Sequence, residues 1–296
     1  MVTKKSQTTI FVLMVCLWSG IALGQEDIGS GLLKIGIGAR PAGLGGAFTA
    51  LSDDINALHW NPAGLGKLRE KELAFTHAVF YGDIREEFVG YAHPLGRLGA
   101  VGGGLTYLHL DEVRQRDESG DEIASFTPYD LLGILAWAGK IGRNFEIGAN
   151  FKYIYQKNRE AEITKANYLD VGGIASFRPL KFGLVLQNLS YDRPKEDPLP
   201  RTVRSGLALN LFNETAIFVL DAVKEKDEDI QYGLGAEYRP GSPLALRLGA
   251  KFDEDEEAKV TAGLGLTWKI CRLDYAFLRH DRNSDNIHRL SLSLRF

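Results

Sequence analysis

The sequence contains little cysteine and no large excess of positive or negative charge. Two cysteines occur among its 296 residues, and one of them, Cys16, lies in an N-terminal segment that we expect to be cleaved. Because Cys271 then stands alone, no intramolecular disulfide is possible, which excludes a disulfide-stabilised secreted scaffold. The 35 Lys and Arg residues nearly balance the 38 Asp and Glu residues. Without a basic excess, the sequence indicates no nucleic-acid partner.

Long hydrophobic runs are also lacking. The run at residues 10–23 has about 14 residues, fewer than the roughly 20 that a transmembrane helix needs. Lys4 and Lys5 precede it, and Ala22 and Gly24 place small residues at positions −3 and −1 of a cleavage site. These features predict a secretory signal peptide over residues 1–24, and hence an exported protein.

The chain does contain strands in which apolar and polar residues alternate, and the last segment shows this most clearly. One face carries His288, Leu290, Leu292, Leu294 and Phe296, and the other carries Ile287, Arg289, Ser291, Ser293 and Arg295. Successive side chains of a strand point to opposite faces, so one face is greasy and the other mostly polar. The segment resembles the last strand of many bacterial outer-membrane barrels. The resemblance implies that the barrel-assembly machinery recognises the strand ending at Phe296.

About fourteen such segments, each near ten residues long, follow residue 70. They cover residues 71–81, 85–94, 98–110, 127–139, 143–156, 165–178, 180–190, 202–212, 214–224, 229–239, 244–253, 257–269, 270–280 and 286–296. Strands of nine to eleven residues suit a tilted membrane crossing. An even number of strands returns the C-terminus to the side on which the first strand began.

The connections between these segments alternate in length. Those after even-numbered segments are short, whereas most after odd-numbered segments are longer and more charged, as at residues 111–126 and 191–201. Residues 82–84 are a short exception. Outer-membrane barrels have short periplasmic turns and longer outside loops. The sequence therefore predicts an all-β fold, a transmembrane antiparallel β-barrel of about 14 strands.

A soluble all-β sandwich or barrel would also show alternating strands. Its solvated faces, however, would be rich in Lys and Glu, whereas the polar faces here carry Gly, Ala, Asn and Ser with sparse charges. A lipid-facing Arg near the bilayer midplane costs about 2–4 kcal/mol, so we expect the strand charges to point into the lumen. The expected lumen charges are Glu146, Lys152, Asp170, Arg204, Glu237 and Arg247.

Residues 25–70 do not read as strands, and glycine is dense from residue 36 to residue 46. Residues 47–51 are compatible with one short helical turn. Neither the dinucleotide-binding nor the P-loop glycine spacing is present, so the glycines indicate backbone packed closely against a barrel wall. We therefore predict three parts: the signal peptide, a hatch at residues 25–70 that plugs the lumen, and the barrel at residues 71–296.

The hatch segment resembles the N-terminal signature of the PorV/PorQ family and, more distantly, the hatch of FadL-type fatty-acid channels. The similar residues include Arg40, Pro41, Gly43, Gly45, Gly46, Asn61, Pro62 and Ala63, and the similarity extends through the barrel segments to residues 288–291. The resemblance implies a fourteen-stranded outer-membrane barrel with a hatch in its lumen. One departure is His59, where the family usually has an aromatic residue; its imidazole is available for hydrogen bonding within the hatch.

Two functions follow from the resemblance. The first is a partner role in type IX protein secretion, with secreted proteins or secretion components as partners. The alternative is passage of a hydrophobic ligand such as a fatty acid across the outer membrane. In that case Arg40 and Asn61 would hold a movable hatch, and Arg204, Arg247 and Lys152 would attract an acyl carboxylate unless Glu146, Glu237 or Asp170 neutralise them. A purely structural barrel, surrounded by outer-membrane lipid and lipopolysaccharide, is a third reading.

Enzymatic chemistry is not indicated. None of the six histidines lies in a nucleophile elbow or at metal-ligand spacing, so we expect no catalytic residues, no metal and no cofactor. His280 beside Asp281, with Ser284 and Asp285 nearby, reads as a solvated loop. The acidic run at residues 253–257 lacks the calcium-loop spacing, and binding of divalent cations there is the less favoured reading.

Overall fold

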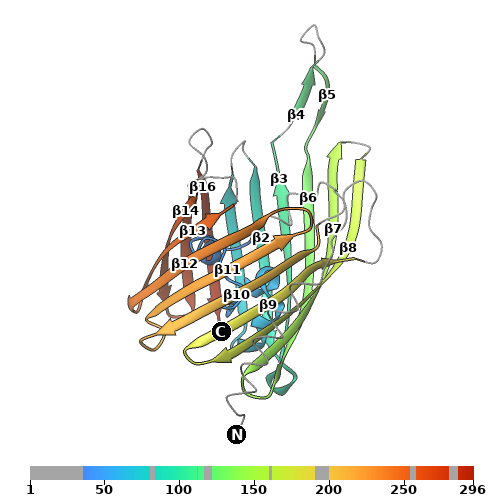
Figure 1. Ribbon diagram of the computed structural model, residues 1–296. Helices are drawn as coiled ribbons and strands as arrows, with labels where there is room; N and C mark the ends of the chain where they lie inside the picture. Colours follow the sequence, from blue (N-terminus) through green and yellow to red (C-terminus); the bar gives the residue numbers. More distant parts are fainter. Residues whose placement is uncertain are drawn as a thin grey trace.

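The computed structural model describes residues 36–80, 84–111, 113–116, 122–159, 162–190, 200–253, 258–279 and 286–296. Within these residues nearly all regular structure is β, and fourteen strands close into one antiparallel barrel (Figure 1). Each strand pairs with its two neighbours, and β1 closes the barrel against β16 from Glu72↔Arg295 to Val79↔His288. The predicted fold class, a 14-stranded antiparallel β-barrel, is confirmed.

The barrel strands run close to the predicted segments. They are β1 (Glu72–Val79), β2 (Arg85–Pro94), β3 (Ala100–His109), β6 (Tyr129–Ile141), β7 (Phe145–Arg159), β8 (Glu162–Phe177), β9 (Leu180–Leu189), β10 (Thr202–Leu211), β11 (Ala216–Glu225), β12 (Ile230–Gly241), β13 (Leu244–Phe252), β14 (Lys259–Trp268), β15 (Cys271–Leu278) and β16 (Ile287–Arg295). Short turns join them at one end and longer connections at the other (Figure 1).

The connection between β3 and β6 differs from the prediction of a plain loop. Strands β4 (Val113–Arg116) and β5 (Glu122–Phe126) pair antiparallel within it and form a separate two-stranded sheet. This hairpin projects beyond the ends of the barrel strands (Figure 1). Its residues are mostly polar and charged, so the sequence gives no alternation of apolar residues by which to recognise it.

The two faces of the wall have opposite chemistry. In β7, Phe145, Ile147 and Phe151 are exposed on the outside, whereas Glu146 and Lys152 are buried on the inside. The same holds along the other strands, so large apolar side chains cover the exterior. A soluble barrel would place its apolar residues inside. No helix among the described residues is long and apolar enough to cross a membrane.

Aromatic rings border this apolar exterior at both ends. Near the longer connections, Tyr107 stacks on His109 with ring centroids 4.7 Å apart, and Tyr129 stacks on Tyr155 at 6.0 Å. Near the short turns, Trp137 and Trp268 are exposed. Aromatic belts at two levels are typical of barrels that cross a membrane, because such rings prefer the headgroup region.

The hatch, of which residues 36–70 are described, lies inside the barrel and is almost wholly buried. It contains α3 (Ala39–Ala42), α4 (Ala57–Trp60) and the 3-10 helix η2 (Pro62–Lys67). Helix α3 packs against β14, β15 and β16, whereas η2 packs against β6, β7 and β8, so the hatch spans the lumen.

Residues 47–51 form a single turn, in which the Ser52 N–H donates to the Phe48 carbonyl at 2.9 Å. The Asn61 side chain accepts from the Ala63 N–H, and Pro62 occupies the first position of η2. Proline suits that position because its fixed φ is preorganised for a helix. The signal peptide, the cluster at residues 280–285 and most of the acidic run at residues 253–257 lie outside the described residues.

Candidate functional site

Glycines on both sides allow hatch backbone to lie directly against wall backbone. Gly45 has φ +65°, and a Cβ there would lie 2.5 Å from the Ala250 carbonyl oxygen. A Cβ on Gly43 would lie 3.1 Å from Gly263 Cα, and one on Gly235 would lie 2.6 Å from the Leu44 carbonyl oxygen. We call this contact between residues 43–45 and strands β12–β14 the glycine seam. The predicted role of hatch glycines, close packing of backbone on the wall, matches this geometry.

Arg40, on α3, is the main ionic contact between the hatch and the wall. The side chain is only 1% exposed. Its Nε lies 3.0 Å from Glu237 Oε2 on β12, and its Nη1 lies 2.7 Å from Asp54 Oδ2 and also contacts Asp53. Burial opposes the charge, but these carboxylates outweigh it and hold the pKa of Arg40 well above its ordinary value. Burial likewise opposes the charge of Asp53, yet Arg40 holds its pKa below the usual range.

The cluster continues across the wall from Glu237. Arg247 Nε lies 2.5 Å from Glu237 Oε2, and its Nη1 lies 2.9 Å from Asp274 Oδ1. Arg239 Nη2 lies 2.5 Å from the other Glu237 oxygen. The expected lumen charges Glu237 and Arg247 therefore pair with each other, and the hatch residue Arg40 pairs with the same Glu237.

A second wall carboxylate holds the turn in the middle of the hatch. Asp221 Oδ2 on β11 accepts hydrogen bonds from the N–H groups of Phe48 and Thr49, both at 2.9 Å, and from the Thr49 hydroxyl at 2.6 Å. Asn61 Nδ2 donates to the Thr49 carbonyl at 2.9 Å and to the Gly173 carbonyl on β8 at 3.3 Å. These contacts fix the middle of the hatch to the wall between β8 and β11.

The remaining expected lumen charges lie on the wall beside α4 and η2. Lys152 Nζ pairs with Asp170 Oδ2 at 2.5 Å, both fully buried. Glu146 is buried close to Gly66 and lies near enough to Lys67 to influence its charge. Burial is the largest influence there and lowers the pKa of Lys67 to about 8.

His59 is buried next to these charges. Its carbonyl accepts a hydrogen bond from Gln187 Nε2 at 2.7 Å, and its ring meets Trp60 edge-on at 5.4 Å. Within the described residues its Nδ1 has no hydrogen-bond partner. Burial, with Lys152 and Arg204, lowers the pKa of His59 well below its ordinary value, so the imidazole is neutral.

The hatch separates two cavities of different character. The outer cavity, of 290 Å³, lies between the hatch and the longer connections and is lined by Trp60, Phe80, Val223 and Leu278 among others. Arg204 also lines it: its Nε donates to the neutral Gln187 amide at 2.7 Å, and its guanidinium lies 5.2 Å from the Trp60 ring. This cavity is amphipathic, because its apolar side chains are joined by eight charged residues: Arg204, Asp221, Glu225, Glu228, Lys251, Lys259, Arg279 and Arg289.

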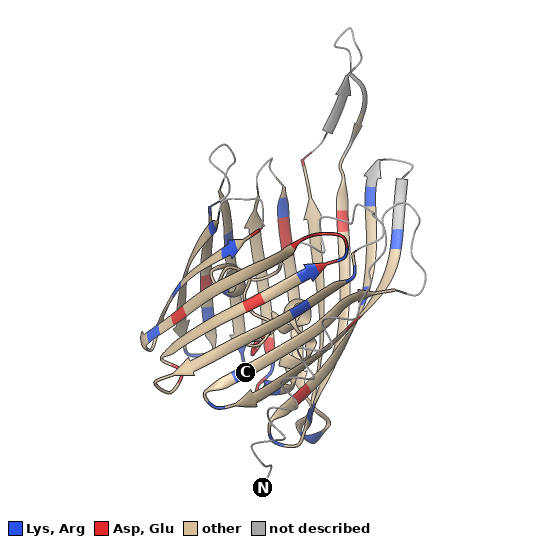
Figure 2. Ribbon diagram, in the orientation of Figure 1, with Lys and Arg blue, Asp and Glu red and all other residues tan. Residues whose placement is uncertain are grey.

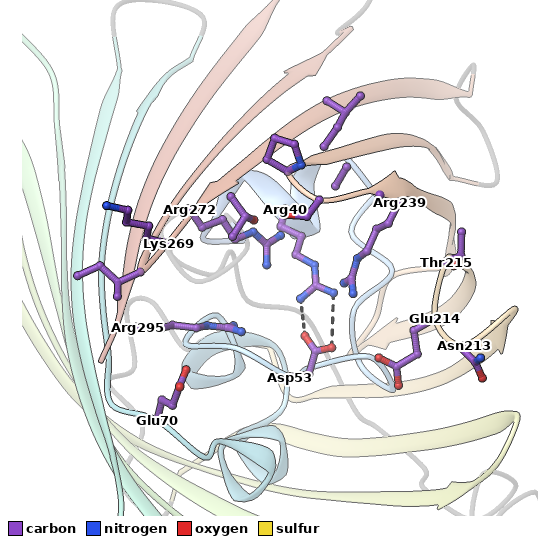
Figure 3. A pocket seen from close by; sticks show the side chains of 17 residues that line it. Arg40, Asp53, Glu70, Asn213, Glu214, Thr215, Arg239, Lys269, Arg272 and Arg295 are labelled. Carbon is purple, nitrogen blue, oxygen red and sulfur yellow. Dashed lines mark hydrogen bonds and ion pairs between the residues drawn. The ribbon is translucent and has the colours of Figure 1, made fainter.

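The inner cavity, of 640 Å³, opens at the short-turn end (Figure 3). Arg40, Arg239 and Arg272 project into it from the hatch and from two strands, with Asp53 facing Arg40 (Figure 3). Its lining is strongly charged, and Arg272 pairs with Asp274 at 2.8 Å. A charged, open vestibule of this kind is filled by water rather than by an apolar molecule.

The hatch residues expected from the sequence all lie in this plug. They are Arg40, Pro41, Gly43, Gly45, Gly46, Asn61, Pro62 and Ala63. Sequence reasoning missed the acids Asp53, Asp54, Asp221 and Asp274. The only local signal was the Asp53–Asp54 pair in an otherwise nearly uncharged segment. No cluster of three or more metal-ligating side chains occurs in the described part of the chain.

Comparisons with known proteins support the fold and match part of the sequence. Residues 25–116 match the model of an uncharacterised protein family, UPF0164. Two UPF0164 proteins of Treponema pallidum are 33% and 28% identical over 122 and 120 residues. Each match covers 39% of this chain, and 30% and 36% of the relatives, so the similarity spans about a third of their length.

Solved structures with a similar fold include hydrocarbon transporters. The toluene transporter TodX of P. putida aligns with a TM-score of 0.68 and 14% identity, covering 88% of this chain and 99% of that one. TbuX, the toluene transporter of Ralstonia pickettii, aligns with a TM-score of 0.65 and 14% identity, covering 88% and 98%. The chain thus has the barrel fold of these FadL-like transporters, and its N-terminal third resembles UPF0164 proteins.

Proposed function

We propose that this protein is an outer-membrane barrel that passes small hydrophobic molecules around or through its hatch. The observation that carries the proposal is the amphipathic outer cavity above a plugged lumen, in a barrel that shares its fold with toluene transporters. Enclosed apolar surface beside a few polar groups is the usual form of a small-molecule site.

The proposed location in the outer membrane is supported by the chemistry of the barrel wall. Apolar side chains cover the exterior, aromatic rings border both ends, and charges are buried inside. Outer-membrane lipid and lipopolysaccharide would then surround the barrel. The signal peptide at residues 1–24 would export the chain, and the final strand ending at Phe296 would engage the assembly machinery.

The cavity also narrows the choice of cation for an acyl carboxylate. Lys152 and Arg247 pair with buried acids at 2.5 Å and 2.9 Å, so their charges are already neutralised. Arg204 instead hydrogen-bonds to a neutral amide and lines the outer cavity. A ligand with an apolar body and a carboxylate would therefore place its apolar part on Trp60 and its charge at Arg204.

Filling the cavity tests the proposal. Gln231 lines the outer cavity from β12, whereas Leu234 on the same strand faces outward and is 43% exposed. In proteoliposomes, uptake of toluene and of a long-chain fatty acid should fall several-fold for Gln231→Trp. The matched variant Leu234→Trp should transport like the unmodified protein. Equal uptake by both variants, or no uptake by any of them, would contradict passage through this cavity.

The second candidate is a partner role in type IX protein secretion, of the PorV/PorQ type. It is favoured by the hatch signature at residues 38–65, and this role stays a prediction. Native mass spectrometry of the protein gently extracted from its own membrane separates the two functions. A co-purifying protein would favour secretion, and a retained apolar molecule without a protein would favour hydrophobic passage.

A further inference from the structure

The short-turn end of the barrel carries an excess of cations. We define the short-turn rim as residues 67–71, 95–99, 140–144, 178–181, 212–215, 240–243 and 269–270, all of which are described. Its basic residues are Lys67, Arg69, Lys71, Arg97, Lys140, Arg143, Arg178, Lys181 and Lys269. Its acidic residues are Glu70 and Glu214. The rim is therefore strongly positive, although the whole chain is slightly acidic.

These rim cations differ from the arginines of the inner cavity. Arg239 and Arg272 are matched by wall carboxylates at 2.5 Å and 2.8 Å. In the described part of the chain, Arg97, Arg143 and Arg178 are exposed and lie in no ion pair with a carboxylate. The positive charge of these three arginines is consequently available to something outside the protein.

Large apolar side chains stand next to these cations. Leu98 follows Arg97 and is 73% exposed, Ile141 follows Lys140, and Leu180 precedes Lys181. On the turn between β14 and β15, Lys269 lies between Trp268 and Ile270, with its Nζ 5.0 Å from the Trp268 ring. Four of the turns thus pair an exposed apolar residue with an adjacent cation.

At the opposite end of the barrel, cations and carboxylates are mixed, and one described connection is acidic. The connection at residues 226–229 carries Asp227, Glu228 and Asp229 with one lysine, and it forms the acidic bend between β11 and β12 in Figure 2. Blue segments at the lower turns mark the rim in the same view. The excess of cations is thus a property of the short-turn rim.

We propose that the short-turn rim binds the phosphate groups of anionic phospholipids in the adjoining membrane leaflet. The proposal rests on the membrane location given above. At such a boundary, apolar and aromatic side chains enter the acyl region while neighbouring Lys and Arg reach the headgroups. Each cation near an anionic surface contributes attraction of this kind, screened by salt.

A lipid fits this surface better than a protein does. Exposed apolar and basic residues adjoin one another on four of the seven rim segments, and the apolar ones continue the lipid-facing belt of the wall. The central cavity, where a protein segment would enter, has its arginines already matched by acids. The rim therefore selects anionic over zwitterionic lipid and holds the short turns at the membrane surface.

Intrinsic tryptophan fluorescence gives a direct test. After residue 24 the tryptophans are Trp60, buried in the hatch, and Trp137 and Trp268, exposed on the wall beside the rim. The full protein is reconstituted in mixed vesicles containing brominated phosphatidylglycerol or brominated phosphatidylcholine, and quenching is compared. We expect the quenching to show that the protein binds the anionic lipid several-fold more strongly than the zwitterionic one at low salt. The ratio of the two affinities should fall toward one in 1 M NaCl.

Charge-neutralised variants locate the preference. A rim variant carries Arg97→Gln, Lys140→Gln, Arg143→Gln, Arg178→Gln and Lys269→Gln. A control variant carries Lys157→Gln, Lys165→Gln, Arg201→Gln, Lys226→Gln and Arg279→Gln at the other end. The rim variant should lose the preference, and the control should keep it. Replacing the three rim arginines by lysine should retain it, which separates charge from misfolding.

Each contrary result has a definite meaning. Equal quenching of the unmodified protein by both lipids would overturn the rim proposal while leaving the membrane location intact. Quenching by neither lipid would overturn the membrane location as well. Equal quenching together with an acidic protein that binds the unmodified protein but not the rim variant would assign the surface to a protein partner instead.

Discussion

Arg40 shows how a single residue connects the hatch to the wall. It is buried and shared among Asp53, Asp54 and Glu237, which come from the hatch itself and from β12. Replacing Arg40 by an uncharged residue should be poorly tolerated, because three carboxylates contact its guanidinium. The cost in stability then depends on how well the remaining cations neutralise these carboxylates.

Removing the charge of Arg40 should destabilise the protein strongly. Arg40→Met removes the cation that Asp53, Asp54 and Glu237 share, although Glu237 keeps Arg239 and Arg247. Breaking a buried ion pair in this way costs about 3–5 kcal/mol. Urea titration of the refolded protein in detergent measures the loss. The exposed rim substitution Arg97→Met should change stability by no more than about 0.5 kcal/mol. Equal effects of the two would show that the Arg40 cluster is not stabilising.

The glycine seam gives a second test at the residue scale. Gly45→Ala should be more destabilising than Gly142→Ala, although both glycines have φ near +65°. A Cβ at Gly142 meets nothing within 4 Å, whereas at Gly45 it meets the backbone of β13. Gly142→Ala should cost about 1 kcal/mol for backbone strain alone, and Gly45→Ala more than twice as much. Thermal unfolding of the two variants separates strain from close packing.

The lowered pKa of Lys67 should make the stability of the fold depend on pH. Its pKa is lowered to about 8 when folded, so between pH 8 and about 10.5 the unfolded chain binds more protons than the folded one. Stability should therefore rise with pH in this window, by roughly 2–3 kcal/mol relative to Lys67→Met. Unfolding free energies measured from pH 7.5 to 10.5 test this, with Lys140→Met as an exposed control. Parallel curves for Lys67→Met and the unmodified protein would contradict it.

At the scale of strands, outward-facing positions should not tolerate charge. Leu248 lies in the middle of β13 and is 66% exposed. In water Leu248→Arg would be nearly neutral, but facing lipid at the midplane it should cost about 2–4 kcal/mol. Folding yield and unfolding free energy in lipid vesicles measure this cost, with the inward substitution Gln231→Arg as a control. A neutral effect of Leu248→Arg would argue against a lipid-facing wall.

The strands were largely predictable, and the reason is their period. The segment predicted at residues 244–253 is β13, Leu244–Phe252, because its alternation has few interruptions. The hairpin of β4 and β5 was missed because no apolar face marks it. The helices α3 and α4 have four residues each, too few to be stable without packing, so local sequence gives little sign of them.

Only part of the candidate site was predictable from the sequence. Alternation alone indicated that Glu237 and Arg247 face inward. Asp274, a second partner of Arg247, is another wall residue that the sequence did not single out. The pairing of Asp221 with residues 48–49 depends on how the hatch is turned inside the wall. That orientation arises from contacts between residues about 170 or more positions apart, which a single sequence does not reveal.

At the scale of the whole molecule, the hatch should close the barrel to ions. It fills the lumen between the outer cavity of 290 Å³ and the inner cavity of 640 Å³. Replacing residues 30–68 with a Gly-Ser linker should turn a poorly conducting barrel into one with large conductance steps in planar bilayers. Unchanged conductance and ligand permeability would contradict a gating role. Circular dichroism of the variant serves as the control for an intact barrel.

The glycine seam also shapes how the hatch would leave its seat. Along the seam itself backbone meets backbone without interlocking side chains, whereas elsewhere buried hatch side chains such as Leu58 and Leu65 pack against the wall. The polar contacts that hold the hatch include Arg40 on Glu237, the residue 48–49 turn on Asp221, and the hydrogen bonds from Asn150 and Gln187 to the Leu58 and His59 carbonyls. A hatch held in this way should leave the lumen abruptly, once those contacts break together.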